Sequence, residues 1–162
     1  MSVVRPAVAL LLAGALAACA PVAPQPPAGA QLRLSSSGLD VAGTGLEVGF
    51  GRTQESATDT LRDILGSPAP PQRSVACAGV QTVRWAEEGL ALHFARDAFV
   101  GWEAVPAPRP IPTASGLRAG GPAPGGAGLG PFERDGIRGL SGPDGEISRL
   151  WAGRDCPTGG VG

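Results

Sequence analysis

Short stretches in which apolar and polar residues alternate dominate the chain from residue 39 onward. Residues 39–50 (LDVAGTGLEVGF) predict two short strands joined by a Gly-Thr-Gly turn. Residues 80–85, 90–94 and 99–103 alternate in the same way, and turn residues separate them, so we expect an antiparallel three-stranded meander. Residues 132–151 predict a further hairpin. The pattern as a whole predicts a domain built largely of antiparallel strands.

One segment, residues 51–68 (GRTQESATDTLRDILGSP), has helical periodicity instead. Thr53 is a good N-cap, Gly66 can adopt the left-handed conformation that ends a helix, and Pro68 prevents its continuation. The apolar residues recur at helical spacing and form one stripe: Ala57, Leu61, Ile64 and Leu65. The stripe needs an apolar surface to cover it, so we expect an α+β fold in which one helix packs on an antiparallel β-meander.

The segment 105–131 has a different composition, rich in glycine and proline, and predicts a long loop. Beyond it, Gly136 precedes Asp144 by the same distance as Gly89 precedes Asp97. This spacing indicates a weak internal repeat, in which a second sheet-forming unit lacks the helix of the first.

The first eighteen residues have the layout of a signal peptide, with Arg5 ahead of an apolar run at 7–16 and small residues after it. The run is too short to span a bilayer comfortably. The motif Leu16-Ala17-Ala18-Cys19 resembles the lipobox of bacterial lipoproteins. That resemblance implies cleavage before Cys19, a lipid on its sulfur and acylation of the new amino terminus, which together anchor a protein stably. The alternative is an ordinary secretory peptide in which Cys19 is incidental.

We therefore expect a signal peptide at 1–18, a Pro/Ala/Ser-rich tether at 19–38, a periplasmic domain at 39–156 and a flexible tail at 157–162. Ala20 rather than an aspartate follows the cysteine, which in enteric-type sorting implies delivery to the outer membrane, facing the periplasm. The covalent lipid is the only non-protein group that the sequence predicts.

With Cys19 assigned to lipid, Cys77 and Cys156 remain. An even pair in an exported domain predicts a disulfide, here between the start of the meander and the end of the chain. A metal or redox pair would be expected in a Cys-x-x-Cys arrangement, which the sequence does not contain. The formal net charge is −1, so the chain lacks the basic surplus of a nucleic-acid-binding protein.

Catalytic chemistry has one candidate centre, because His93 is the only histidine. A triad mechanism would need it together with partners such as Ser74, Asp97 or Glu103, but nothing in the sequence positions them. Its strand phase places His93 opposite the apolar face, so we expect a surface or second-layer histidine. The pair Glu87-Glu88 is expected to form a solvated turn. An envelope hydrolase using His93 is the alternative to a non-catalytic protein.

The three tryptophans, Trp85, Trp102 and Trp151, together with His93 would form a binding surface if they were exposed, for example for the glycan of peptidoglycan. Their alternation with other apolar residues favours core packing instead. Glycan binding is therefore the second alternative.

The opening Gly51-Arg52-Thr53, the close Leu65-Gly66-Ser67-Pro68 and the meander that follows resemble the small outer-membrane lipoproteins that accompany the barrel-assembly machinery. The related β-lactamase inhibitory protein fold doubles such a helix-plus-sheet unit. The resemblance implies a non-catalytic scaffold that binds proteins or envelope components. From the sequence we thus expect a membrane-anchored envelope lipoprotein with a protein partner and no enzymatic activity.

Overall fold

The computed structural model describes residues 31–126 and 128–157, and these form one α-helix and two antiparallel sheets. The elements in chain order are β1 (Gln31–Ser35), β2 (Gly38–Ala42), β3 (Leu46–Gly49), α1 (Gln54–Leu65), β4 (Gln72–Arg73), β5 (Val80–Trp85), β6 (Leu90–Ala95), β7 (Ala98–Ala104), β8 (Gly130–Arg134), β9 (Ile137–Ser141) and β10 (Ile147–Gly153). A single 3₁₀ turn lies at Pro124–Gly126. The prediction of an α+β fold with one helix and antiparallel strands is confirmed.

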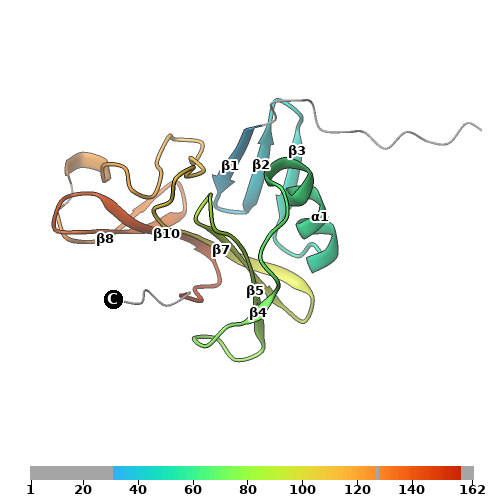
Figure 1. Cartoon of the computed structure of the whole chain (residues 1–162). Coiled ribbons are helices and arrows are strands. Elements are labelled where there is room, and N and C mark those ends of the chain that lie inside the picture. The colour runs from blue at the N-terminus through green and yellow to red at the C-terminus, as the bar shows by residue number, and fades with distance from the viewer. Residues whose placement is uncertain (1–30, 127, 158–162) are drawn as a thin grey trace, which may run out of the picture.

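The sheets are more extensive than the predicted meander. Three strands form a small sheet in the order β1-β2-β3, and seven form a large sheet in the order β4-β5-β6-β7-β10-β9-β8. The first meander, β5-β6-β7, and the second, β8-β9-β10, meet where β7 pairs with β10, with Trp102 opposite Ala152. This central pairing joins both meanders into one sheet (Figure 1).

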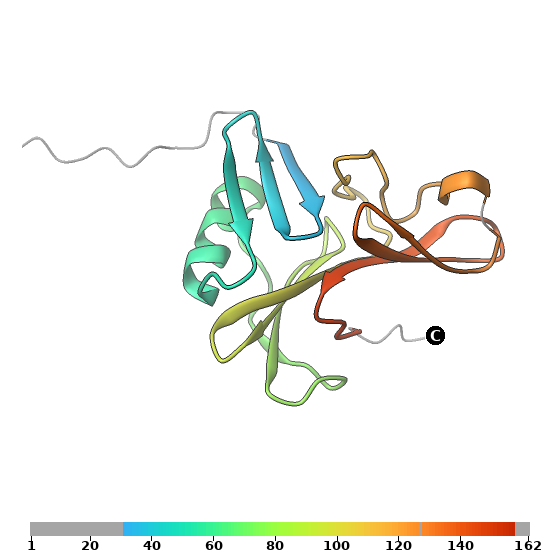
Figure 2. The same cartoon turned by 180° about the vertical axis from the view of Figure 1, so that it is seen from behind.

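The small sheet, α1 and the loop between β7 and β8 all lie on the same side of the large sheet, as the two opposite views show (Figures 1 and 2). We call the side that they cover the core face. It carries the apolar residues of the central strands, and the small sheet, the helix and the loop add to the same core. The core residues on this face of the large sheet include Val83, Trp85, Leu90, Leu92, Phe94, Phe99, Trp102 and Leu150.

The helix forms for the reasons that its sequence predicts. The Thr53 side chain accepts a hydrogen bond from the Ser56 N–H (3.3 Å), which satisfies one of the free donors of the first turn. Gly66 ends the helix at φ +87°, and its N–H donates to the Arg62 carbonyl (2.9 Å). Ala57 and Leu61 are fully buried against the core. Ile64 and Leu65 are partly buried and pack against the same core.

The domain begins earlier than predicted, because residues 31–38 belong to it rather than to the tether. Strand β1 pairs with β2 over its whole length, and Leu32 and Leu34 enter the core from it. Only these two leucines alternate with polar residues, so the pattern was too short to mark a strand beside a proline-rich segment. The remainder of the predicted tether, the signal peptide and Cys19 lie outside the described residues. Within those residues, no helix is both long and apolar enough to cross a bilayer.

Candidate functional site

The three tryptophans are buried, and the prediction of core packing is confirmed for Trp85 and Trp102, which belong to the hydrophobic core. Trp85 and Trp102 lie on the core face, 3% and 0% exposed. Their indole N–H groups donate to the carbonyls of Gly66 (2.9 Å) and Ser35 (2.8 Å), so they fasten the large sheet to the end of the helix and to the small sheet. Trp151 is also buried but lies on the opposite side of the sheet. An exposed aromatic surface is therefore not formed.

The opposite side of the large sheet, which we call the polar face, is defined by Thr82, His93, Glu103, Arg149 and Trp151. These residues share one face because the strand register places Thr82 opposite His93, and Trp151 opposite Glu103. His93 and Glu103 are both candidates from the sequence, and the structure brings these two together. Ser74 and Asp97 lie elsewhere, where they bond the backbone N–H groups of Cys77 and Gln54.

His93 was expected to be a surface or second-layer residue, and the surface expectation is wrong, since His93 is 0% exposed on the side of the sheet opposite the core face. The cause is the segment 154–156, which follows β10 and crosses the polar face. Gly101, the neighbour of His93 in β7, has no side chain, and a Cβ there would lie 2.5 Å from the Arg154 carbonyl oxygen. The Arg154 N–H donates to the Val100 carbonyl (2.8 Å). We call this segment the strap.

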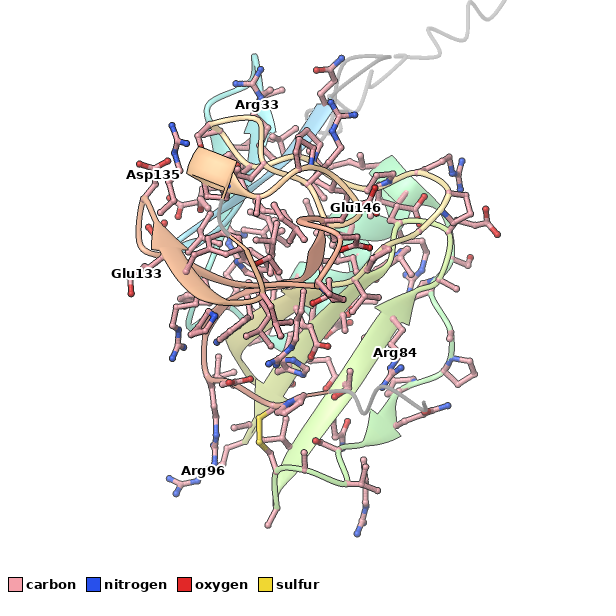
Figure 3. The ribbon with its side chains drawn as sticks, turned by 90° about the vertical axis from the view of Figure 1, so that its left-hand side faces the viewer. Arg33, Arg84, Arg96, Glu133, Asp135 and Glu146 are labelled. Atoms are coloured by element: carbon pink, nitrogen blue, oxygen red, sulfur yellow. A yellow bond between two sulfur atoms is a disulfide. The ribbon has the colours of Figure 1, made fainter. Side chains whose placement is uncertain are left out.

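A disulfide fixes the end of the strap. Cys77, which precedes β5, is bonded to Cys156 with an S–S distance of 2.20 Å and a Cα–Cα distance of 5.6 Å, as the sequence predicts. Cys156 is fully buried. Figure 3 shows this bond in yellow, beside β5. It therefore holds the chain end against the first meander.

Beneath the strap, the buried polar groups lie close together. The His93 Nδ1 atom lies 3.2 Å from the Thr82 hydroxyl, and Nε2 lies 3.9 Å from Glu103 Oε2. On the other side of Glu103, the Arg149 guanidinium places Nη2 at 3.3 Å from Oε2 and Nε at 3.3 Å from Oε1. Arg149 also bonds Asp155 of the strap. The hydrogen bonds are interrupted between His93 and Glu103, since His93 Nε2 has no hydrogen-bond partner within the described residues.

Burial controls the charge of this cluster. Burial is the main cause that lowers the pKa of His93 to about 4. The negative charge of Glu103 raises this pKa, but the positive charges of Arg149 and Arg84 oppose that effect. Burial also acts against the charge of Arg149, but its hydrogen bond to Asp155 and the charge of Glu103 outweigh that effect and raise its pKa. At neutral pH, His93 is therefore neutral beside a charged Arg149–Glu103 pair.

A neutral histidine beside a threonine hydroxyl and a carboxylate has the composition of a general-base site. The geometry does not suit that chemistry, since His93 and Thr82 are buried to 0% and 3% exposure and the strap crosses above them. A substrate would reach neither group without displacement of the strap. Thr82, Arg149 and Asp155 were not identified from the sequence. The alternation of Thr82 with Val83 was the signal that could have placed it beside His93.

A groove of ≈ 900 Å³ lies on the other side of the molecule, between α1 and the segment 67–71. Val83 and Phe94 of the large sheet lie beneath it but are 0% and 1% exposed. The exposed apolar residues that line the groove are those at 69–71. The hydroxyl of Thr58, a residue only 9% exposed, has no hydrogen-bond partner within the described residues. The charged residues that line the groove are Glu55, Asp59, Arg62, Arg96 and Asp97. No pattern in the sequence indicates this groove.

The expected solvated turn at Glu87-Glu88 is wrong for the second residue. Glu88 is 6% exposed, and its carboxylate pairs with the Arg109 guanidinium at 2.9 Å. Glu88 and Arg109 line a smaller pocket of ≈ 410 Å³ together with Leu32 and Ile111. The pairing arises because the loop after β7 returns to this turn, where the Arg109 N–H donates to the Glu87 carbonyl (2.8 Å).

Among the described residues, no three His, Cys, Asp or Glu side chains are grouped so that they could hold a metal ion. Comparison of the chain with protein-family models, with curated proteins and with solved structures found no match.

Proposed function

We propose that this protein is a membrane-anchored envelope lipoprotein whose domain acts as a non-catalytic binding module. The observation that carries the binding role is the groove beside α1, which combines an exposed apolar wall at residues 69–71 with a charged rim. Recognition sites in proteins have this composition, with apolar walls and a few polar groups that fix orientation.

The cellular address rests on the amino-terminal motif and on the disulfide. The lipobox-like Leu16–Cys19 motif supports a lipid anchor on Cys19 and a tether that leads to β1. Disulfides persist in oxidising compartments, and the Cys77–Cys156 bond therefore favours the periplasm over the cytoplasm. Ala20 supports attachment to the outer membrane.

Binding is favoured over the two alternatives by the placement of their candidate residues. A hydrolase would need His93 to reach a substrate, and the strap crosses above it. A glycan platform would need exposed aromatic rings, and the three tryptophans are buried. The groove, in contrast, is open to solvent along a rim that includes Gln81 and Asp59.

The rim of the groove indicates the chemistry of the partner. Three carboxylates, those of Glu55, Asp59 and Asp97, and two guanidiniums line it, and one guanidinium, that of Arg62, already pairs with Asp59. We therefore expect a protein segment that packs apolar side chains against the wall at residues 69–71 and places a basic side chain at the rim. An envelope protein with such a segment is the proposed partner, and nucleic acid is not.

The two meanders also fit the proposal of a degenerate repeat. Gly89 and Gly136 both precede the middle strand of a meander with a positive φ, of 63° and 73°. In the second unit the loop after β7 covers the sheet, and Ile111 and Leu117 enter the core from it. A glycine- and proline-rich loop would thus replace the second helix of the doubled unit.

Site-specific photo-crosslinking in a bacterial host tests the binding role. A photoreactive residue at Gln81, on the rim, should give a reproducible adduct with one envelope protein. The same residue at Glu133, exposed on β8 and far from the groove in the sheet order, is the matched control and should not. Equal adducts at both positions, or none at Gln81, would reject the groove as the binding surface.

Metabolic labelling with a fatty acid tests the anchor separately. The unchanged chain should incorporate label and fractionate with membranes, and the Cys19→Ser chain should do neither. If the unchanged protein is found unlabelled and free in the periplasm, the leader is an ordinary secretory peptide instead.

A further inference from the structure

We propose that the polar face of the large sheet binds the carboxylates of an acidic peptide, and that Asp155 of the strap occupies part of this site in the structure. The site lies on the opposite side of the sheet from the α1 groove. It depends neither on that groove nor on the lipid anchor.

The centre of the site is the Arg149 guanidinium, which is held on two sides. Glu103 holds it from below with two contacts of 3.3 Å, and the Trp151 ring lies 4.4 Å from its central carbon. The Arg149 side chain is only 14% exposed. A guanidinium fixed in this way loses little freedom when it binds a second carboxylate, which its planar fork accepts in a defined geometry.

A second guanidinium lies beside the first. Arg138 is opposite Trp151 in the strand register, and its central carbon lies 5.4 Å from the centre of the same ring. Its Nη2 donates to the Gly153 carbonyl at 2.8 Å, and the residue is exposed. The Trp151 N–H is buried and has no acceptor within the described residues, so packing beneath the two cations holds this ring. The result is a pair of cations on one aromatic support.

The strap supplies the carboxylate that such a pair attracts. Asp155 bonds Arg149, and its own side chain is 37% exposed, so the contact lies at the surface. The disulfide at Cys156 and the hydrogen bond from Arg154 to Val100 hold Asp155 in this position from both sides. Asp155 therefore acts as an internal ligand with which an incoming carboxylate must compete.

This competition defines the class of ligand. A single free carboxylate gains little over Asp155, because it would only exchange one ion pair for another. A peptide with several neighbouring carboxylates can contact both Arg138 and Arg149, whereas the structure shows Asp155 paired with Arg149. The site thus selects acidic segments over isolated carboxylates.

Removal of the internal ligand tests the proposal directly. The probe is a fluorescein-labelled hexa-aspartate peptide, titrated by fluorescence anisotropy against the full chain in detergent, with a hexa-serine peptide as the uncharged control. The Asp155→Asn variant keeps the strap and the disulfide but removes the competing charge. It should bind the probe roughly tenfold more tightly than the unchanged protein.

Two further variants in the Asp155→Asn chain locate the binding. Arg138→Met should weaken binding by roughly tenfold, whereas Arg134→Met, at an exposed arginine on β8, is the matched control and should not change it. Arg149→Met should abolish binding. Because it leaves Glu103 buried without this cation, it is combined with Glu103→Gln, and thermal melting checks the fold of each chain. If the Arg149 chain does not fold, the comparison of Arg138 with Arg134 decides.

Three results would overturn the proposal. The first is that Asp155→Asn binds hexa-aspartate no more tightly than the unchanged chain. The second is that Arg138→Met and Arg134→Met weaken binding equally. The third is that hexa-serine binds as well as hexa-aspartate. Each would show that the arginines on the polar face serve only the internal ion pairs. The measurement uses purified protein, so it is independent of the crosslinking and labelling results.

Discussion

The burial of His93 makes the stability of the folded protein depend on pH in a predictable direction. The perturbation is acidification from pH 7 to pH 4. His93 is 0% exposed, and burial is the main cause that lowers its pKa from 6.5 to about 4. In the unfolded chain the same imidazole is solvated and keeps its ordinary pKa. The folded and unfolded chains therefore bind a different number of protons between these two values.

The sign follows from which state binds the proton. Above pH 6.5 His93 is neutral in both states, so the full stability is present. Between pH 6.5 and about 4 the unfolded chain takes up a proton that the folded chain does not. The free energy of unfolding should then fall by ~1.4 kcal/mol per pH unit, and by about 3 kcal/mol over the whole interval. That loss is a large share of the stability of a small domain.

The assay is urea denaturation at pH 7, 6, 5 and 4 for the unchanged protein and for His93→Gln. Carboxylates also titrate in this range, and the variant controls for them because it keeps every acidic residue but cannot take up the imidazole proton. From pH 7 to pH 4, the free energy of unfolding should fall by about 3 kcal/mol more for the unchanged protein than for His93→Gln. The NMR signal of the imidazole C–H gives the pKa directly, since the chain has one histidine.

Two results would refute the reasoning. The unfolding free energies of the two proteins could remain parallel from pH 7 to pH 4, or the imidazole signal of the folded protein could titrate near pH 6.5. Either would mean that water reaches His93 and that the strap does not seal this residue from solvent.

Three other changes should have measurable effects. Replacing both Cys77 and Cys156 by serine should lower the unfolding free energy by about 4 kcal/mol, because the bond closes a loop across 79 positions; the measurement is urea denaturation, and an unchanged midpoint would contradict it. Gly101→Ala should displace the strap, since its Cβ would meet the Arg154 backbone at 2.5 Å; hydrogen exchange at residues 154–156 should accelerate, and unchanged exchange would count against the contact. Thr58→Val should raise the unfolding free energy by about 1 kcal/mol, because the buried hydroxyl has no partner within the described residues; a loss of stability would show that the hydroxyl is hydrogen-bonded in solution.

Local sequence signals predicted the elements that depend on local interactions. The helix and its ends follow from Thr53, Gly66 and the apolar stripe, and each of these acts within a few residues. The three strands of the first meander follow from alternation and from short turns. Strand β1 was missed because two leucines are too few to establish a period of two.

The polar face could not be predicted in the same way, because its environment is assembled from distant parts of the chain. His93 alternates with Leu92 and Phe94 as a surface residue would, and its burial comes from a strap more than fifty positions later. Two signals pointed toward this arrangement. Gly101 interrupts a strand with a residue that has no side chain, and the pairing of Cys77 with Cys156 requires the chain end to return to the first meander.

The order of strands in the large sheet has a consequence for how the chain folds. The last strand, β10, lies in the middle of the sheet between β7 and β9, and not at an edge. Each meander can form its hairpins as soon as it is synthesised, but the two halves have no hydrogen-bonded connection until β10 arrives. A chain that stops before residue 147 would leave β7 and β9 as unpaired edges on two separate sheets. The whole domain can therefore fold only when β10 has been synthesised and has paired with β7 and β9. The disulfide can form only after this pairing.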